Sequence, residues 1–176
     1  MTTFKYIPEK AEQAILYASS KLPTQRNMYW VLKALYFADI KHLHEFGRFI
    51  YGDSYVALQH GPVPSNAYNL VQNARQSHLS ATSEDEKKDA LFTVRDNDTI
   101  EPLVQADLSC FSKSDLACLN EAIEIVRPLT FGKLRDLSHD AAYNSVGDND
   151  FMSVDSIASM SPQKDELLEH LNYRHA

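Results

Sequence analysis

The sequence predicts a mainly α-helical protein of the α+β class, built as one compact domain over residues 1–176. Three observations lead to this prediction. Residues 28–46 are apolar on nearly every side of a helix, which is typical of a helix surrounded by protein. The stretches on both sides of them repeat apolar residues at helical spacing. Two short stretches rich in aromatic and β-branched residues flank turn residues, which indicates one or two short β-hairpins.

In the first half of the chain, the expected elements are a helix over 8–22, the central helix over 28–46, an extended stretch over 49–59, a stiff turn over 60–64 and a helix from there to about 75. Pro8 suits the first position of its helix, and Gly47 suits the end of the central helix. The extended stretch reads as a short hairpin or a curled loop around Gly52 and Asp53, lying against the central helix.

In the second half, the expected elements are a polar loop or frayed helix end over 77–89, a hairpin with strands over 91–94 and 99–104, helices over 113–127 and 131–137, and a last helix over 162–173. Ser112 and Asp115 have the spacing of a capping box. Pro128 ends the helix behind them, and Thr130 caps the next one. The core is expected to span residues 8–146, with the last helix packed on it.

Composition limits what the protein can do. Apolar residues make up 44% of the chain, enough for a packed core, and the formal net charge is −7. Such a charge disfavours a protein that grips phosphate backbones, so we do not expect nucleic acid as a partner. The central region offers only a modest positive strip of Lys33, Lys41, His44 and Arg48. The start of the chain lacks a signal-peptide pattern, no stretch is apolar enough to cross a membrane, and Cys110 and Cys118 are read as reduced, partly buried thiols, so we expect a cytoplasmic protein.

Asp39 is the residue of the central helix that most needs an explanation. At helical spacing it shares a face with apolar side chains, where a carboxylate is unfavourable unless it is paired or hydrogen-bonded. Its candidate partners are Arg48, Tyr55, His60 and His139. Three readings stay open: a buried polar tie that fixes the packing of the next loop, a carboxylate placed in a cleft, or a carboxylate that simply reaches solvent.

The turn His60-Gly61-Pro62-Val63-Pro64 is the most constrained loop of the sequence. Each proline keeps the residue before it out of helical space. The helix that follows has free N–H groups at its start, which would suit an anion. The turn is expected either to position this helix only or to be displayed as a stiff contact for a partner or ligand.

Signatures of catalysis are weak. Asp39 and His42 could share a metal ion with His60 or His139, which would make the protein a small metal-dependent hydrolase. The run Ser138-His139-Asp140 contains the residues of a catalytic triad, but adjacent side chains diverge. The chain has no nucleotide-binding glycine pattern. We therefore expect that the protein is not an enzyme, and that it has no catalytic residue, metal ion or cofactor.

The central block resembles the Panacea domain, the domain of SocA-like antitoxins and phage-associated GepA-like proteins. The resemblance lies in residues 32–39 (LKALYFAD), Gly47, Tyr55-Val56-Ala57, the turn 60–64 and Tyr68. Ser138, His139 and Tyr143 resemble the C-terminal part of the family pattern, although the family more often has a tryptophan at the last position. The resemblance covers roughly residues 8–146.

The resemblance implies an antitoxin of a type II toxin–antitoxin system that neutralises a cognate toxin protein by direct contact. A proteolytic adaptor that delivers the toxin to a cytoplasmic protease is the alternative, and a homodimer is compatible with either. Tyrosines and a stiff turn suit an interface. The residues expected to contact the partner are Tyr36, Asp39, Arg48, Tyr55, His60, Pro62, Tyr68 and His139.

Overall fold

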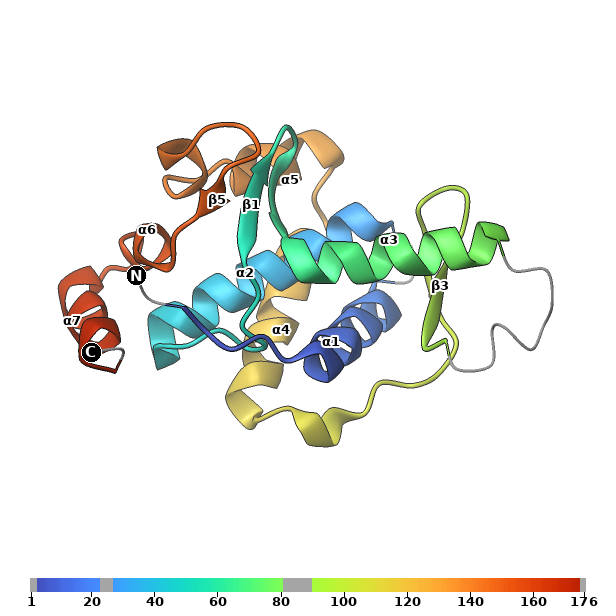
Figure 1. Cartoon of the computed structure of the whole chain (residues 1–176), viewed down its shortest axis with the longest axis horizontal. Coiled ribbons are helices and arrows are strands. Elements are labelled where there is room, and N and C mark those ends of the chain that lie inside the picture. The colour runs from blue at the N-terminus through green and yellow to red at the C-terminus, as the bar shows by residue number, and fades with distance from the viewer. Residues whose placement is uncertain (1–2, 23–26, 81–89, 175–176) are drawn as a thin grey trace.

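A computed structural model describes residues 3–22, 27–80 and 90–174. Its centre is helix α2 (Met28–Phe46), which runs through the middle of the molecule with the helices of the main core around it (Figure 1). These are α1 (Pro8–Lys21), α3 (Ser65–Ser80), α4 (Lys113–Val126) and α5 (Phe131–Ser138). Helix α4 packs along α2 more extensively than any other element does. The predicted mainly α-helical fold around a central helix is confirmed.

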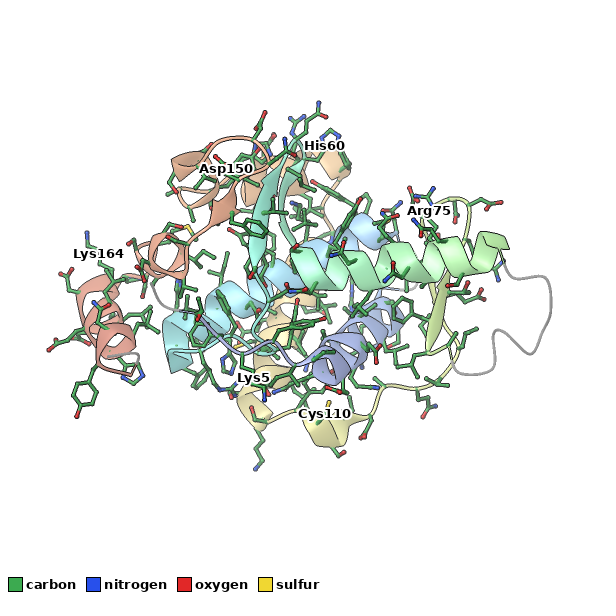
Figure 2. The ribbon with its side chains drawn as sticks, in the orientation of Figure 1. Lys5, His60, Arg75, Cys110, Asp150 and Lys164 are labelled. Carbon is green, nitrogen blue, oxygen red and sulfur yellow. The ribbon has the colours of Figure 1, made fainter. Side chains whose placement is uncertain are left out.

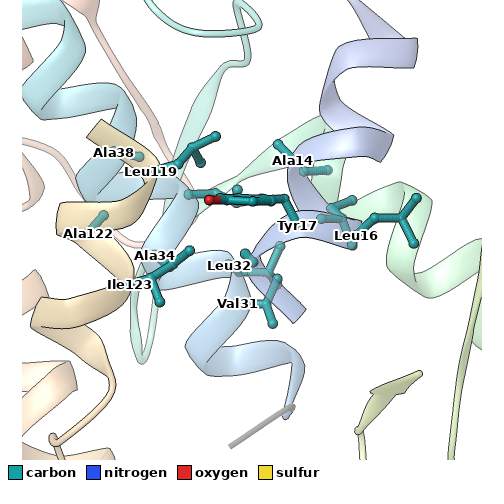
Figure 3. Packing of buried hydrophobic residues seen from close by; sticks show 14 of the residues in the cluster. Ala14, Leu16, Tyr17, Val31, Leu32, Ala34, Ala38, Leu119, Ala122 and Ile123 are labelled. Carbon is teal, nitrogen blue, oxygen red and sulfur yellow. The ribbon is translucent and has the colours of Figure 1, made fainter. Parts of the chain in front are cut away.

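Helix α2 owes its position to its apolar surface. Its buried residues come from all sides of the helix. The Asn27 side chain caps its start by accepting a hydrogen bond from the N–H of Tyr29, and Gly47 ends it with φ of +67°, as the sequence predicts. Figure 3 shows the resulting core, in which side chains of α1, α2 and α4 meet: Ala14, Leu16, Tyr17, Val31, Leu32, Ala34, Ala38, Leu119, Ala122 and Ile123.

The flanking helices begin at the proline and the capping residues that the sequence predicts. Pro8 lies in the first turn of α1. Ser112 and Asp115 form both bonds of the predicted capping box at α4, and Thr130 accepts from the N–H of Lys133 at α5. The expected polar stretch 77–89 falls partly on the end of α3, and residues 81–89 lie outside the described part of the chain.

A three-stranded antiparallel sheet packs against one side of α2. Its strands are β2 (Gly61–Pro64), β1 (Tyr55–Leu58) and β5 (Phe151–Met152), in that spatial order. Val56 lies opposite Val63 on one side and Phe151 on the other. Strand β2 is an edge strand, which suits its two prolines because a proline cannot donate to a neighbouring strand.

The sequence left two readings open for residues 49–59 and two for residues 60–64, and the structure separates them. The hairpin turns at Gln59 and His60, whereas Gly52 and Asp53 lie in a curled loop before β1, so the reading of a hairpin around them is wrong. Gly52 has φ of +75°, and a Cβ there would lie 2.2 Å from the carbonyl oxygen of Lys5, so this bend lets the N-terminal segment pass close to the chain. Residues 61–64 are a buried strand instead of a displayed turn, because both faces of the short sheet are covered by core side chains.

The remaining elements complete the molecule. The second hairpin is confirmed, with strands β3 (Phe92–Val94) and β4 (Ile100–Pro102). The short helices are η2 (Leu108–Cys110), η3 (Tyr143–Ser145) and α6 (Val154–Ala158), and α7 (Lys164–Arg174) is the last helix. The sequence patterns did not predict β5 or α6. Helix α7 places Leu167 and Leu171 in a second core cluster with Leu43 of α2. None of the helices in the described part is long and apolar enough to cross a membrane.

Candidate functional site

Asp39 is a buried polar tie. Its carboxylate is fully buried and accepts hydrogen bonds from the N–H of Ile50 at 2.7 Å and from the hydroxyl of Tyr55 at 2.8 Å. Burial raises the pKa of Asp39 to about 7, against the lowering effect of these two bonds. Of the four candidate partners, only Tyr55 bonds to Asp39.

Arg48 and His42 contact a different carboxylate, that of Asp115 on α4. Asp115 is buried and lies 2.9 Å from Arg48 Nη2, 3.1 Å from His42 Nε2 and 2.6 Å from Lys10 Nζ. Burial alone would raise the pKa of Asp115, but the bonds from His42, Lys10 and the N–H of Ser112 outweigh it and hold the pKa well below its usual range. The cluster joins α1, α2 and α4, so it holds the helices together.

The N-terminus of α3 is already occupied by an anion of the protein itself. The buried Asp53 carboxylate accepts hydrogen bonds from the N–H groups of Asn66 and Ala67, each at 2.9 Å. The helix start thus binds an anion, as expected, but the anion is the side chain of Asp53, 13 residues before Asn66 in the same chain.

The expected positive strip also does not form. Lys33 is buried, Arg48 is paired with Asp115, and Lys41 is paired with Glu45 and Glu121. His44 Nε2 contacts the carbonyl oxygen of Ile157 at 2.9 Å. Both cysteines are free thiols, but Cys110 is exposed rather than partly buried, and Cys118 is buried.

Four aromatic or histidine side chains gather where the start of α2, the turn between β1 and β2, and α5 meet. We call Tyr29, His60, Phe131 and His139 the His60 face. The Tyr29 hydroxyl donates to the carbonyl oxygen of His60 at 2.9 Å, and the Phe131 ring lies 4.6 Å from the Tyr29 ring and 5.4 Å from the His60 ring, between centroids. His139 stacks on Tyr143 at 4.2 Å. His60 and Phe131 are exposed, so the face reaches the surface, and Figure 2 places His60 at the rim of the molecule.

A buried lysine lies under this face. Lys33 is only 1% exposed, and its Nζ donates to the carbonyl oxygen of Pro62 at 2.7 Å and lies 5.3 Å from the centre of the Tyr29 ring. Burial lowers the pKa of Lys33 to about 7, although the nearby Asp140 raises it. A Cβ on Gly61, which has φ of +97°, would lie 2.6 Å from Lys33 Nζ and 2.4 Å from Ser138 Oγ. Only a glycine therefore allows the strand, the lysine and α5 to come this close.

The three adjacent residues Ser138, His139 and Asp140 form no triad. Ser138 Oγ donates to the carbonyl oxygen of Arg135, and Asp140 accepts from the Tyr36 hydroxyl at 2.7 Å. His139 Nε2 is buried without a hydrogen-bond partner among the described residues. The three side chains thus diverge, as expected for neighbours in the chain.

The eight residues expected to contact a partner divide by burial. Tyr36, Asp39, Tyr55 and Pro62 are buried, so their side chains have little surface for a partner in this structure. His60 is exposed, while Arg48, Tyr68 and His139 are half-buried. The structure brings His139 next to Gly61, which lies between His60 and Pro62 in the chain, and it places Arg48 elsewhere, at Asp115.

Sequence reasoning missed three contributors to this region: Tyr29, Lys33 and Phe131. One signal could have identified Lys33. A helix that is apolar on every side has no solvent-exposed polar face for a lysine. A buried hydrogen-bond acceptor for Lys33 could therefore have been predicted. For Phe131 no local signal exists, because its contacts come from residues far away in the sequence.

The metal-binding alternative loses its ligands in this arrangement. Asp39 is engaged by Tyr55 and Ile50, and His42 by Asp115 and the carbonyl oxygen of Arg48. Across residues 3–22, 27–80 and 90–174, no three His, Cys, Asp or Glu side chains are placed to hold a metal ion together.

The chain matches a known protein family. The family model described as "Antitoxin SocA-like, Panacea domain" matches residues 31–143, which is more than half of the chain and extends from the first turn of α2 to the first residue of η3. No curated protein and no solved structure matches the chain significantly.

Proposed function

Because the chain belongs to the antitoxin SocA-like, Panacea domain family, we propose that it is an antitoxin that neutralises a cognate toxin protein by direct contact. The match over residues 31–143 is the observation that carries this proposal. The match covers most of the central helix, the β1–β2 hairpin and α5, so it includes three members of the His60 face, His60, Phe131 and His139, while Tyr29 lies just before it.

We place the toxin contact on the His60 face. Phe131 is 41% exposed, although its ring packs against the rings of Tyr29 and His60. An aromatic ring that is exposed but held by neighbours loses little conformational entropy on binding, and such residues are common among the few that dominate an interface. The buried residues Lys33 and Gly61 then support the face from beneath and need not touch the partner.

The experiment uses the full chain and the protein encoded by the neighbouring gene as the candidate toxin. Co-expression should restore growth, and the purified proteins should form a complex that calorimetry detects in the absence of any protease. Absence of both rescue and complex contradicts the proposal for that pair. A binding measurement without protease also separates neutralisation by contact from delivery for degradation.

Variants then test the location of the contact. Phe131→Ala should weaken the complex by about tenfold or more, the effect of losing one dominant interface residue. Ile125→Ala on α4 removes an exposed apolar side chain of similar exposure, 47%, and should leave the affinity unchanged. If Phe131→Ala and His60→Ala both bind as well as the wild type, the contact lies on another surface.

A further inference from the structure

A shallow groove lies between the C-terminal end of α2 and α7, at the end of α2 opposite to the His60 face. Its volume is about 310 Å³. Its walls include Glu45, Phe46, Gly47, Glu166, Leu167 and His170. Gly47 lets α7 approach, because a Cβ there would lie 2.9 Å from His170 Cδ2. Figure 1 shows α7 beside this end of α2, away from the turn between β1 and β2.

The walls of the groove combine an aromatic ring with the carboxylates of Glu45 and Glu166, beside the imidazole rings of His44 and His170. Phe46 is 48% exposed, and its ring packs on His42 at 4.7 Å between centroids. Glu45 lines the groove and shares Lys41 with Glu121, so one cation serves two carboxylates. Glu166 brings a further carboxylate from the first turn of α7. The carbonyl end of α2 adds the negative pole of its helix dipole.

These features select a cation with a flat face. A guanidinium group stacks on aromatic rings and forms forked hydrogen bonds with carboxylates, whereas an ammonium group is a compact and strongly hydrated charge. The formal net charge of −7 would draw a basic partner toward the protein. We therefore propose that the groove binds an arginine side chain of a partner protein. This proposal stands apart from the toxin contact at the His60 face.

Nuclear magnetic resonance on the full-length ¹⁵N-labelled chain tests the proposal without any toxin. The probe is the tripeptide acetyl-Gly-Arg-Gly-amide, and its neutral control replaces arginine with citrulline, which has nearly the same shape. The arginine peptide should cause saturable shifts of the amide signals of Phe46, Gly47 and Leu167. The citrulline peptide should bind at least fivefold more weakly. Equal binding of the two peptides, or equal binding of a lysine tripeptide, would overturn the assignment.

Matched variants separate the groove from general attraction to an acidic protein. Glu166→Gln removes a charge from the groove and should weaken binding of the arginine peptide at least threefold. Glu124→Gln removes a charge from the exposed surface of α4, where Glu124 pairs with Arg127, and should leave binding unchanged. Both positions are exposed, so both variants are expected to fold. If the two variants lose affinity equally, or neither loses it, the groove is not the site.

Discussion

The hydroxyl group of Tyr55 on β1 donates a 2.8 Å hydrogen bond to the carboxylate of Asp39 on α2, with both side chains fully or almost fully buried. The same carboxylate accepts from the N–H of Ile50. One side chain therefore fixes both the sheet and the loop before it against the central helix. Asp39→Ala should lower the free energy of unfolding by about 1–3 kcal/mol, because it leaves two buried donors without an acceptor. Urea denaturation at pH 7 measures this, and an unchanged midpoint would contradict the role.

Asp39 should also make stability depend on pH. Its pKa is raised from 3.8 to about 7 in the folded protein, so the folded state holds the proton more tightly than the unfolded chain. The contribution of this group to stability is full below about pH 4 and is lost as the pH rises through about 7. Thermal unfolding at intervals between pH 4 and 8 should show a smaller decline in Asp39→Asn than in the wild type. Parallel profiles would show that the pKa of Asp39 is not raised.

Lys33 should also make stability depend on pH, but at higher pH than Asp39 and in the opposite direction. Burial lowers its pKa from 10.5 to about 7, so between these values the unfolded chain binds more protons than the folded protein. This group therefore makes the protein more stable as the pH rises from about 7 to 10. Replacing Lys33 by Met, which has a similar shape and no charge, should flatten that rise in urea midpoints. The profile below pH 6 serves as the control, because there both folded and unfolded Lys33 are protonated.

Asp115 should be the most sensitive carboxylate of the helical core. Asp115→Asn leaves Lys10 and Arg48 without their shared anion, and we expect a loss of about 3 kcal/mol in the free energy of unfolding. Because its pKa is lowered in the folded state, the stabilisation it provides is present above about pH 4 and is lost in acid. Asp136→Asn is the control: this exposed carboxylate pairs with the adjacent Arg135, and its loss should change stability by less than about 0.5 kcal/mol.

Two glycines of the same region should respond in opposite directions to alanine. Gly61→Ala adds a Cβ at positive φ against Ser138 Oγ and Lys33 Nζ, so the protein should be destabilised and the His60 face displaced. Gly132 lies in α5, and a Cβ added there would meet no atom within 4 Å, so Gly132→Ala should be neutral or stabilise by up to about 1 kcal/mol. Melting temperatures of the two variants check this, and equal losses would contradict the contact around Gly61.

The cap of α3 offers another measurable effect. Asp53→Ala removes the acceptor of the N–H groups of Asn66 and Ala67 and should lower the free energy of unfolding by about 1–2 kcal/mol. Asp53→Asn keeps one acceptor oxygen and should lose less. Hydrogen exchange of the first-turn amides of α3 should speed up in Asp53→Ala. Unchanged exchange would show that water replaces the carboxylate without loss.

The features that the sequence predicted correctly are local. The burial of α2 follows from its apolar surface, and the caps at Ser112, Thr130 and Gly47 involve residues only a few positions apart. The missed features depend on distant partners. Lys33 bonds to a carbonyl 29 residues away, and Asp53 accepts from an N–H group 13 residues further along the chain, at Asn66. Neither contact can be recognised from the sequence pattern of a single helix.

The candidate site was predicted only in part for the same reason. His60 and His139 were singled out, and the fold brings them into one region, but Pro62 is buried, which contradicts the reading in which this proline is displayed. Proline argues against a strand in general, and here it is tolerated because β2 lies at the edge of its sheet. The sequence does not tell whether Tyr36 and Tyr55 are buried or exposed, because tyrosine is common both in cores and at interfaces. The structure shows that both are buried.

The edge position of β2 has a consequence for how copies of this protein meet. The ring nitrogens of Pro62 and Pro64 carry no hydrogen, and the carbonyl oxygen of Pro62 is already taken by Lys33. A strand of another molecule would therefore meet few free backbone donors and acceptors along the edge of β2. Edge-to-edge pairing of strands, a common first step of fibril formation, is therefore unfavourable at β2, although an unprotected edge strand would normally allow it.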